Sequence, residues 1–359
     1  MQHYYASQGQ LSQSPAPHSQ KAADWQWLDF THTEVATDAN DFVRQIQAHT
    51  HVTIQELHIQ DATNLNHPSH HDRTPDYDMV VFRKLSTITS KNASVHAPLQ
   101  NALRSIQTRP VTFFIAGNSL ITVRAGDNPI VDALCQKMQC GLLKAPDNAL
   151  DMVLRLLNAL VDAYLELRHP MTEQLDRWQR RLLDPAKPFR DWMLLLDARL
   201  ELRKLEALSE EQIDALQELQ DSLLDNKITP IGDTSMVRLR DVIEHTERVL
   251  NHARRLETSV ESAIQLHFAA SSHETNALIK RLSLLTAVFA PLTLITGVFG
   301  MNFEFMPLLK NPIGFWITIG FMVCLCITLI FTSSHLRSWL VRWRKKSRHL
   351  KSDTNTDLD

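Results

Sequence analysis

The sequence is poor in glycine and cysteine and has no excess of charge of either sign. Its 359 residues include nine glycines, four cysteines, and 37 Lys and Arg against 40 Asp and Glu. The cysteines show no zinc-type spacing, and a chain of this length is not a disulfide scaffold. The near balance of charge gives no indication of a nucleic-acid partner.

The sequence also lacks the common catalytic motifs. It contains no Walker-type loop, no Gly-x-Ser-x-Gly, no His-Glu-x-x-His and no Rossmann fingerprint. Histidines and acidic residues are plentiful, but none has a spacing that requires catalysis. We therefore expect that the chain is not an enzyme.

The first residues do not resemble a secretory signal, because no basic start is followed by an apolar core. Residues 1–23 are instead polar and contain prolines. This composition predicts a disordered N-terminal tail at 1–23.

Two long stretches near the C-terminus carry no charge. One lies between Arg281 and Glu304 and the other between Lys310 and His335. Each has about 22 residues or more, and at about 1.5 Å per residue each is long enough to cross a bilayer. Two buried helices of a soluble core are the alternative, but the tandem arrangement favours membrane spans. We expect a transmembrane domain at 278–334, with spans at about 279–300 and 313–334 and an outer loop at 301–312.

Basic residues flank both predicted spans. Lys280 and Arg281 precede the first, and residues 337–351, after the second, include seven Lys and Arg and no acid. By the positive-inside rule, both flanks are cytoplasmic. The sequence thus predicts a multi-pass protein of the inner (plasma) membrane, with a basic tail at 335–359 and both termini in the cytoplasm.

A mixed α/β domain is expected at 24–147. Runs rich in β-branched and aromatic residues occur at 25–30, 78–85, 110–117 and 119–125. The last two flank Gly117-Asn118, which predicts a hairpin. Helical stretches such as 38–50 lie between the strands.

Long helices are expected after residue 147. Residues 148–277 are rich in Leu, Ala, Glu and Arg with apolar residues three and four apart, which predicts a cytoplasmic helical stalk. After Pro230 and Gly232, residues 234–299 contain only one proline and one glycine. This pattern predicts one helix that continues from the stalk into the first span.

Small and hydroxylated residues recur every seven positions along this helix. The two series are Asn276, Ser283, Ala290 and Gly297, and Ile279, Thr286, Thr293 and Gly300. A small-residue stripe is typical of helix packing in membranes. Alternatively, several copies turn the stripe toward a shared axis and line a pore. Two spans cannot enclose a pore alone, so the second interpretation requires an oligomer.

The sequence Gly300-Met301-Asn302, at the outer end of the first span, resembles the signature of the CorA-type divalent metal ion transporters. Residues 275–307 are similar to that family's first span and loop, and residues 240–249 to the start of its stalk helix. The domain order matches as well. The resemblance implies a funnel-shaped homopentamer in the lipid bilayer with an axial pore lined by the first span.

The resemblance also implies roles for individual residues. Gly300, Met301 and Asn302 form the outer selectivity ring, where the Asn302 amide meets the water shell of a hydrated Mg²⁺. Ile279 and Leu282 correspond to the apolar gate. The pore-lining set is Asn276, Ile279, Leu282, Ser283, Thr286, Ala290, Thr293 and Gly297.

Regulation by cytoplasmic Mg²⁺ is a further implication of the resemblance. The family's inhibitory metal binds acidic residues of neighbouring subunits, and Asp241 and Asp61 fall at such positions, with Gln60 where a second acid often stands. Bound metal holds the channel closed, whereas its release leaves carboxylates that repel each other.

The identity of the ion has competing indications. Glu304 remains in the outer loop, but Leu308 replaces a common acid and Lys310 follows. The zinc-transporting branch usually has a glycine pair after the tripeptide, and its absence favours Mg²⁺, with Co²⁺ or Ni²⁺ as further substrates.

Two alternatives to magnesium transport remain open from the sequence. The histidines His67, His70 and His71 suit Zn²⁺, although a polar surface loop is the simpler explanation of the cluster. A membrane-anchored sensor or scaffold, in which the spans only tether the α/β domain, is the non-transport alternative. It predicts no requirement for Asn302.

Overall fold

The computed structural model of the chain describes residues 1–7, 9–13, 24–86, 103, 105–126, 128–182, 192–225, 232–301 and 313–329. The chain divides into two compact units, Met1–His267 and Phe268–Asp359. The boundary predicted at residue 147 does not separate compact units, because the helices that follow it share a core with the sheet. The second boundary falls at 267, ten residues before the predicted 277.

The first unit contains a mixed sheet. Within the described residues its strand order is β2-β1-β3-β7-β6-β5-β4. The strands are β1 Gln2–Ser7, β2 Gln10–Ser12, β3 Trp25–Thr31, β4 His70–Arg73, β5 Asp78–Leu85, β6 Thr108–Ala116 and β7 Ser119–Arg124. Strands β3 and β7 pair in parallel, whereas the other neighbours are antiparallel.

The predicted hairpin is confirmed. Ala116 pairs with Ser119, so a two-residue turn joins β6 to β7. Gly117 has a φ of 54°, a left-handed conformation that glycine adopts without steric cost. The Asn118 side chain donates to the carbonyl of Asp24 at 3.1 Å, which ties the turn to the start of β3.

The prediction of a disordered tail at 1–23 is wrong for residues 2–7 and 10–12, which form β1 and β2. Alternate residues of β1 face the core, so Tyr4 and Ala6 are buried. The Tyr4 ring lies 5.0 Å from the ring of Trp27. This contact with β3 gives the polar segment an apolar face, which stabilises it as a strand.

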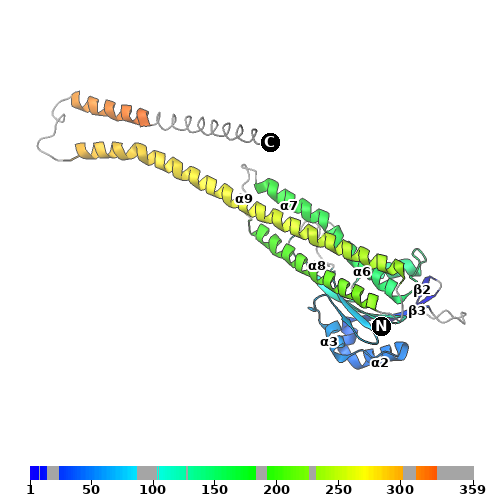
Figure 1. Cartoon of the computed structure of the whole chain (residues 1–359). Helices are drawn as coiled ribbons and strands as arrows, with labels where there is room; N and C mark the ends of the chain where they lie inside the picture. Colours follow the sequence, from blue (N-terminus) through cyan, green and yellow to red (C-terminus); the bar gives the residue numbers. More distant parts are fainter. Residues whose placement is uncertain are drawn as a thin grey trace, which may run out of the picture. The chain divides into compact units, whose positions relative to one another are not determined.

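Helices cover both faces of the sheet, as Figure 1 shows for α2, α3 and α6. Strand side chains alternate between the two faces. On one face, Leu28, Phe30 and Phe114 pack against three short helices. These are α1 His32–Thr37, α2 Ala39–Thr50 and α3 Glu56–Thr63.

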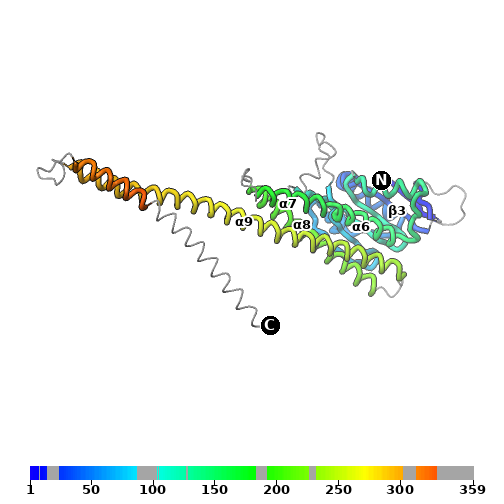
Figure 2. Tube along the Cα trace, turned by 90° about the horizontal axis from the view of Figure 1, so that it is seen from above, coloured from blue at the N-terminus to red at the C-terminus, as the bar shows by residue number. Residues whose placement is uncertain are grey.

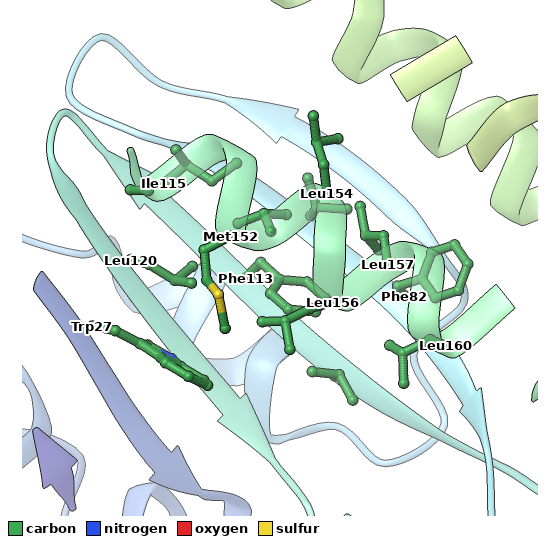
Figure 3. Close-up of a cluster of buried hydrophobic side chains, with 14 of the residues drawn as sticks. Trp27, Phe82, Phe113, Ile115, Leu120, Met152, Leu154, Leu156, Leu157 and Leu160 are labelled. Atoms are coloured by element: carbon green, nitrogen blue, oxygen red, sulfur yellow. The ribbon is translucent and has the colours of Figure 1, made fainter. Parts of the chain in front are cut away.

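The opposite face packs against a second set of helices. Two of them are α5 Pro129–Gln139 and α6 Ala149–Glu166. In Figure 3, Trp27, Phe113 and Leu120 of the sheet face Met152 and Leu156 of α6. The Asn148 side chain caps α6 by accepting from the Asp151 amide at 2.7 Å.

A helical layer completes the first unit. It is made of α7 Arg168–Leu182, α8 Met193–Asp225 and the first part of α9, which spans Asp233–Phe299. Figures 1 and 2 both show α7, α8 and this part of α9 side by side. Arg199 of α8 contacts Glu257 of α9 at 3.3 Å, and Arg254 of α9 contacts Glu206 at 2.7 Å. The prediction of one continuous helix over 234–299 is confirmed.

In the second unit, α9 is followed by a helix at Ile313–Leu329. The α9 segment is long and apolar enough to cross a membrane, and the second helix is a shorter apolar helix of 17 residues within the described part of the chain. The two helices lie side by side in Figures 1 and 2. The basic tail at 335–359 and most of the loop at 301–312 lie outside the described residues.

Asp78 joins the end of α8 to the sheet. Its Oδ1 atom accepts from the Ser222 hydroxyl at 2.7 Å and contacts His71 Nε2 at 3.1 Å. Burial raises the pKa of Asp78, but the hydrogen bonds from His71 and Ser222 and the charges of His71 and Arg73 outweigh burial, so the pKa is lowered.

We therefore expect Asp78 to stabilise the fold above the ordinary Asp pKa of about 3.9 and to lose this effect as the pH falls through its lowered value. Replacement with alanine should lower the free energy of unfolding by about 2 kcal/mol at pH 7. It should also flatten the loss of stability below about pH 4. Urea unfolding of the full chain in detergent, measured against pH, checks both effects; parallel pH curves for the two proteins would contradict the assignment.

Candidate functional site

The stripe on α9 is exposed along its length. All of its residues are exposed in the single chain. They are Asn276, Ile279, Leu282, Ser283, Thr286, Ala290, Thr293, Gly297 and Gly300. The hydroxyls of Thr286 and Thr293 donate to the carbonyls of Leu282 at 3.0 Å and Phe289 at 2.9 Å. Their donors are thus satisfied within the helix, while their oxygen lone pairs remain available to accept hydrogen bonds.

The stripe lies opposite the face of α9 that is partly covered. The half-buried residues are Leu284, Val288, Pro291, Leu292, Ile295 and Phe299. An α-helix turns by about 100° per residue, so the centre of this half-buried face lies about 180° around the helix axis from the centre of the stripe. The neighbouring helix also has one face that is less exposed than the rest. This face consists of Gly314, Thr318, Met322, Leu325, Cys326 and Leu329. The stripe therefore does not pack against the chain's own second apolar helix.

Glycines lie at the C-terminal end of the stripe. A Cβ added at Gly297 meets no atom within 4 Å. A Cβ at Gly300 would lie only 3.2 Å from the carbonyl oxygen of Thr296, so this position after the helix end suits glycine. Met301 follows and is half-exposed. Asn302 and Glu304 lie outside the residues that the structure describes.

Asp241 lies on the outer surface of α9 in the first unit. Its side chain is 56% exposed, and Oδ1 lies 3.5 Å from Nε2 of His245. His245 Nδ1 in turn faces Asp162 of α6 at 3.7 Å. Asp162 and Asp241 line a cavity of about 360 Å³ together with Arg155 and Arg238. Burial, and then the charge of Arg238, lowers the pKa of Arg155.

Asp61 lies on α3, on the other side of the sheet from α9. Its Oδ1 atom lies 3.4 Å from Nε2 of His67, and its side chain is 26% exposed. The two predicted regulatory carboxylates are therefore not brought together within one chain. Among the described residues, no group of three His, Cys, Asp or Glu side chains could hold a metal ion.

The histidines of 67–71 do not form a metal centre of their own. His71 is buried in the edge strand β4 and therefore does not lie in a surface loop. His67 and His70 have ring centroids 6.2 Å apart. No sequence pattern indicated the nearby His58, which contacts the Tyr77 hydroxyl at 2.7 Å and Asp72 at 2.9 Å.

The fold and the stripe together define a class: an α/β protein whose longest helix continues from the α/β unit into an uncharged, exposed, small-residue segment. The family model of the CorA-like Mg²⁺ transporter proteins matches residues 22–332 of the chain. The chain belongs to this family. The family is one of transporters, which agrees with the absence of catalytic motifs from the sequence.

Individual relatives support the same assignment. The chain is 24% identical over 232 residues to the cobalt/magnesium transport protein CorA of Thermotoga maritima, covering 64% of each protein. It matches the complete structure of the CorA magnesium transporter from Methanocaldococcus jannaschii with a TM-score of 0.73 and 16% identity, covering 92% of this chain and 96% of that one. The full-length CmaX protein matches with a TM-score of 0.67 at 16% identity, covering 94% and 97%.

Proposed function

We propose that the chain forms a homopentameric channel that passes Mg²⁺ across the inner membrane. The observation that carries this proposal is the direction of the α9 stripe. Its small and hydroxylated residues lie on the face turned away from the chain's own second helix. In lipid, a face that offers oxygen lone pairs is more stable against water or another copy than against hydrocarbon.

The proposed membrane arrangement has two spans, at about 279–300 and 313–334, with both termini in the cytoplasm. In the most apolar 18-residue stretch of α9 the mean hydropathy is 2.0, yet only 6% of this stretch is buried. An exposed apolar surface of this kind is stable in lipid and costly in water. The basic residues 337–351 support a cytoplasmic C-terminal end.

The proposed pore narrows from polar positions to an apolar gate. Asn276 and Thr293 supply polar rings, while Ile279 and Leu282 form the constriction that excludes water in the closed state. The side chains of Ile279 and Leu282 are 56% and 65% exposed in the single chain, which leaves them free to meet their copies around an axis. A ring of apolar side chains can stop ions without a physical plug.

The proposed selectivity ring is Gly300-Met301-Asn302. Mg²⁺ dehydrates reluctantly, so an outer ring selects it best through hydrogen bonds to its bound waters. The amide oxygen of Asn302 can accept such bonds without carrying a charge that would trap the ion. Gly300 lets the chain leave the helix close to the Thr296 carbonyl.

Mg²⁺ is the proposed substrate, with Co²⁺ as a second ion. The Thermotoga maritima relative is named for both ions. The glycine pair of the zinc-transporting branch is absent after Asn302. Ni²⁺ and Zn²⁺ are the alternative substrates. Asp61 and Asp241 of neighbouring subunits are the proposed regulatory site, where bound cytoplasmic metal favours the closed state.

Mg²⁺ uptake into proteoliposomes tests the proposal. The Asn302→Ala variant should take up Mg²⁺ at least about tenfold more slowly, because a lost hydrogen bond of about 1 kcal/mol corresponds to about fivefold and every copy in the ring loses one. Asn311→Ala, in the same loop, is the matched control and should retain wild-type uptake. A membrane-anchored sensor or scaffold predicts no uptake by any of the three proteins, whereas undiminished uptake by Asn302→Ala would remove the tripeptide from the selectivity ring.

A further inference from the structure

The cavity beside Asp241 has an apolar lining and polar groups that the proposed metal regulation does not use. Its volume is about 360 Å³. Apolar side chains form much of the lining, and these are Leu134, Leu143, Leu154 and Val242. Arg155 and Asn158 of α6 and Arg238 of α9 also border it. Small-molecule sites commonly have volumes of about 300–1,000 Å³, apolar walls and a few convergent polar groups, so this cavity has the composition of such a site.

Two arginines from different helices border this cavity. Arg155 Nη1 donates to the carbonyl oxygen of Lys144 at 2.6 Å, which fixes one side of its guanidinium. Within the described part of the chain, Arg238 Nη1 is buried and makes no hydrogen bond, although it lies 3.7 Å from Asp151 Oδ1. A buried donor without an acceptor is costly. An oxyanion in the cavity would supply acceptors to both guanidinium groups.

The charge of the arginine pair is not fully offset by nearby acids. Burial, and then the charge of Arg238, lowers the pKa of Arg155. The charges of nearby aspartates act in the opposite direction but do not outweigh these effects. Asp162 lies seven residues after Arg155, about 10 Å farther along α6. Asp241 follows Arg238 by about one turn, but its side chain is 56% exposed, so water screens its charge. The arginine end of the cavity therefore favours an anion.

An acceptor without a donor lies on the same face of α6 as Arg155. Asn158 follows Arg155 by three residues, so the two side chains share a face. The Asn158 Nδ2 atom donates to Asp162 Oδ2 at 3.1 Å, whereas its Oδ1 atom is buried and receives no hydrogen bond from the residues that the structure describes. A ligand that satisfies both the arginines and Asn158 must carry an oxyanion and a hydrogen-bond donor. Hydroxylated oxyanions have this combination.

The presence of two arginines favours phosphate over carboxylate. A guanidinium binds an oxyanion best through two parallel hydrogen bonds. A carboxylate has two oxygens and is occupied by one guanidinium in this way, whereas a phosphate monoester has three free oxygens and can serve two. The pair Arg155 and Arg238 therefore suits a phosphate monoester.

We propose that the cavity binds a phosphate monoester with a hydroxylated body, the chemistry shared by nucleoside and sugar phosphates. Arg155 and Arg238 hold the phosphate oxygens. Asn158 Oδ1 accepts from a hydroxyl or amino group of the body, and the apolar lining covers the rest of the ligand. Because the inference concerns binding alone, it does not depend on the proposed function.

Equilibrium dialysis of radiolabelled AMP against the full-length protein in detergent, at pH 7.5 with EDTA, tests the proposal. EDTA removes divalent metal, so the carboxylates cannot hold the phosphate through a cation. We expect saturable binding of AMP. Arg155→Gln and Arg238→Gln should each raise the Kd about tenfold or more, because each removes a charge-assisted hydrogen bond. Arg240→Gln, at an exposed arginine of α9, is the matched control and should bind as wild type.

Competition on the wild-type protein keeps the test independent of how the variants fold. Adenosine lacks the phosphate and should need a concentration at least about 100-fold higher than AMP to displace the label, because both arginine contacts are lost. Inorganic phosphate lacks the body and should need about tenfold more than AMP. Ribose 5-phosphate that competes as well as AMP would identify sugar phosphates as ligands, whereas weaker competition would identify nucleoside phosphates.

Four results would overturn the inference. Absence of AMP binding at millimolar concentration would exclude the ligand class, and equal competition by AMP and adenosine would exclude recognition of the phosphate. Inorganic phosphate that competes as well as AMP would exclude a role for the apolar lining and Asn158. Binding that requires added Mg²⁺, or that is unchanged in both arginine variants, would place the ligand on other residues.

Discussion

Replacement of Gly297 with leucine is expected to stop Mg²⁺ flux, lowering it at least about 100-fold, because apolar side chains in a pore exclude water and ions. In the single chain a Cβ at this position meets no atom within 4 Å, so the leucine does not disturb the fold of its own subunit. The loss of flux would thus come from the meeting of several copies around the pore axis. Proteoliposome uptake, combined with size-exclusion chromatography of the solubilised variant, measures flux and assembly separately.

Gly320→Leu is the matched control for this variant. Gly320 lies on the Ile313–Leu329 helix, is exposed, and has equally open space around its added Cβ. We expect its uptake to stay within about threefold of wild type, because the second span does not line the pore of the proposed channel. Normal flux in Gly297→Leu, or equal loss in both variants, would show that the stripe is not the pore lining.

The stripe could be found in the sequence because its signal is local. Residues seven apart on one helix share a face whatever surrounds the helix. The sequence alone therefore shows that Ser283, Ala290 and Gly297 lie on the same face. The sequence could not show which neighbour the stripe faces. That depends on which face of α9 is partly covered, and the Ile313–Leu329 helix beside it comes from a separate part of the sequence.

Strands β1 and β2 show a second limit of the sequence. Residues 2–7 alternate in burial, with Tyr4 and Ala6 facing the core. This short alternation was hidden by the polar residues between them and by the prolines that follow. The pairing of Gln2 with Asp29 in β3 is what makes the segment a strand, and such long-range pairing has no local signature.

Family resemblance predicted Asp61 and Asp241 as regulatory carboxylates, but it did not indicate that His67 and His245 lie beside them. His245 follows Asp241 by four residues on a helix, so its proximity was readable from spacing. His67 was not readable in this way, because the end of α3 and a turn separate it from Asp61. Sequence patterns locate residues on one helix well and residues on different elements poorly.

Removal of the Arg124 charge is expected to lower the free energy of unfolding of the first unit by about 3–5 kcal/mol. Arg124 on β7 and Asp29 on β3 are both at least 95% buried. Arg124 Nη2 donates to Asp29 Oδ2 and to Asp132 Oδ1, each at 2.8 Å. Burial lowers the pKa of Arg124, but the hydrogen bonds and charges of the two aspartates outweigh burial and raise it. Arg124→Met therefore leaves the Asp29 carboxylate buried without its counter-charge.

The double variant Arg124→Met with Asp29→Asn tests whether this cost comes from the stranded charge. An asparagine at 29 is neutral and can still accept from Thr122, whose hydroxyl donates to Asp29 in the wild type. We expect the second substitution to restore more than half of the lost stability, as is common when both members of a buried ion pair are replaced. Tryptophan fluorescence follows the unfolding in urea, because the buried Trp27 donates to Thr122 at 3.0 Å. If the double variant is less stable than Arg124→Met, the loss comes from packing and the Asp29–Arg124 pair does not hold β3 against β7 through its charge.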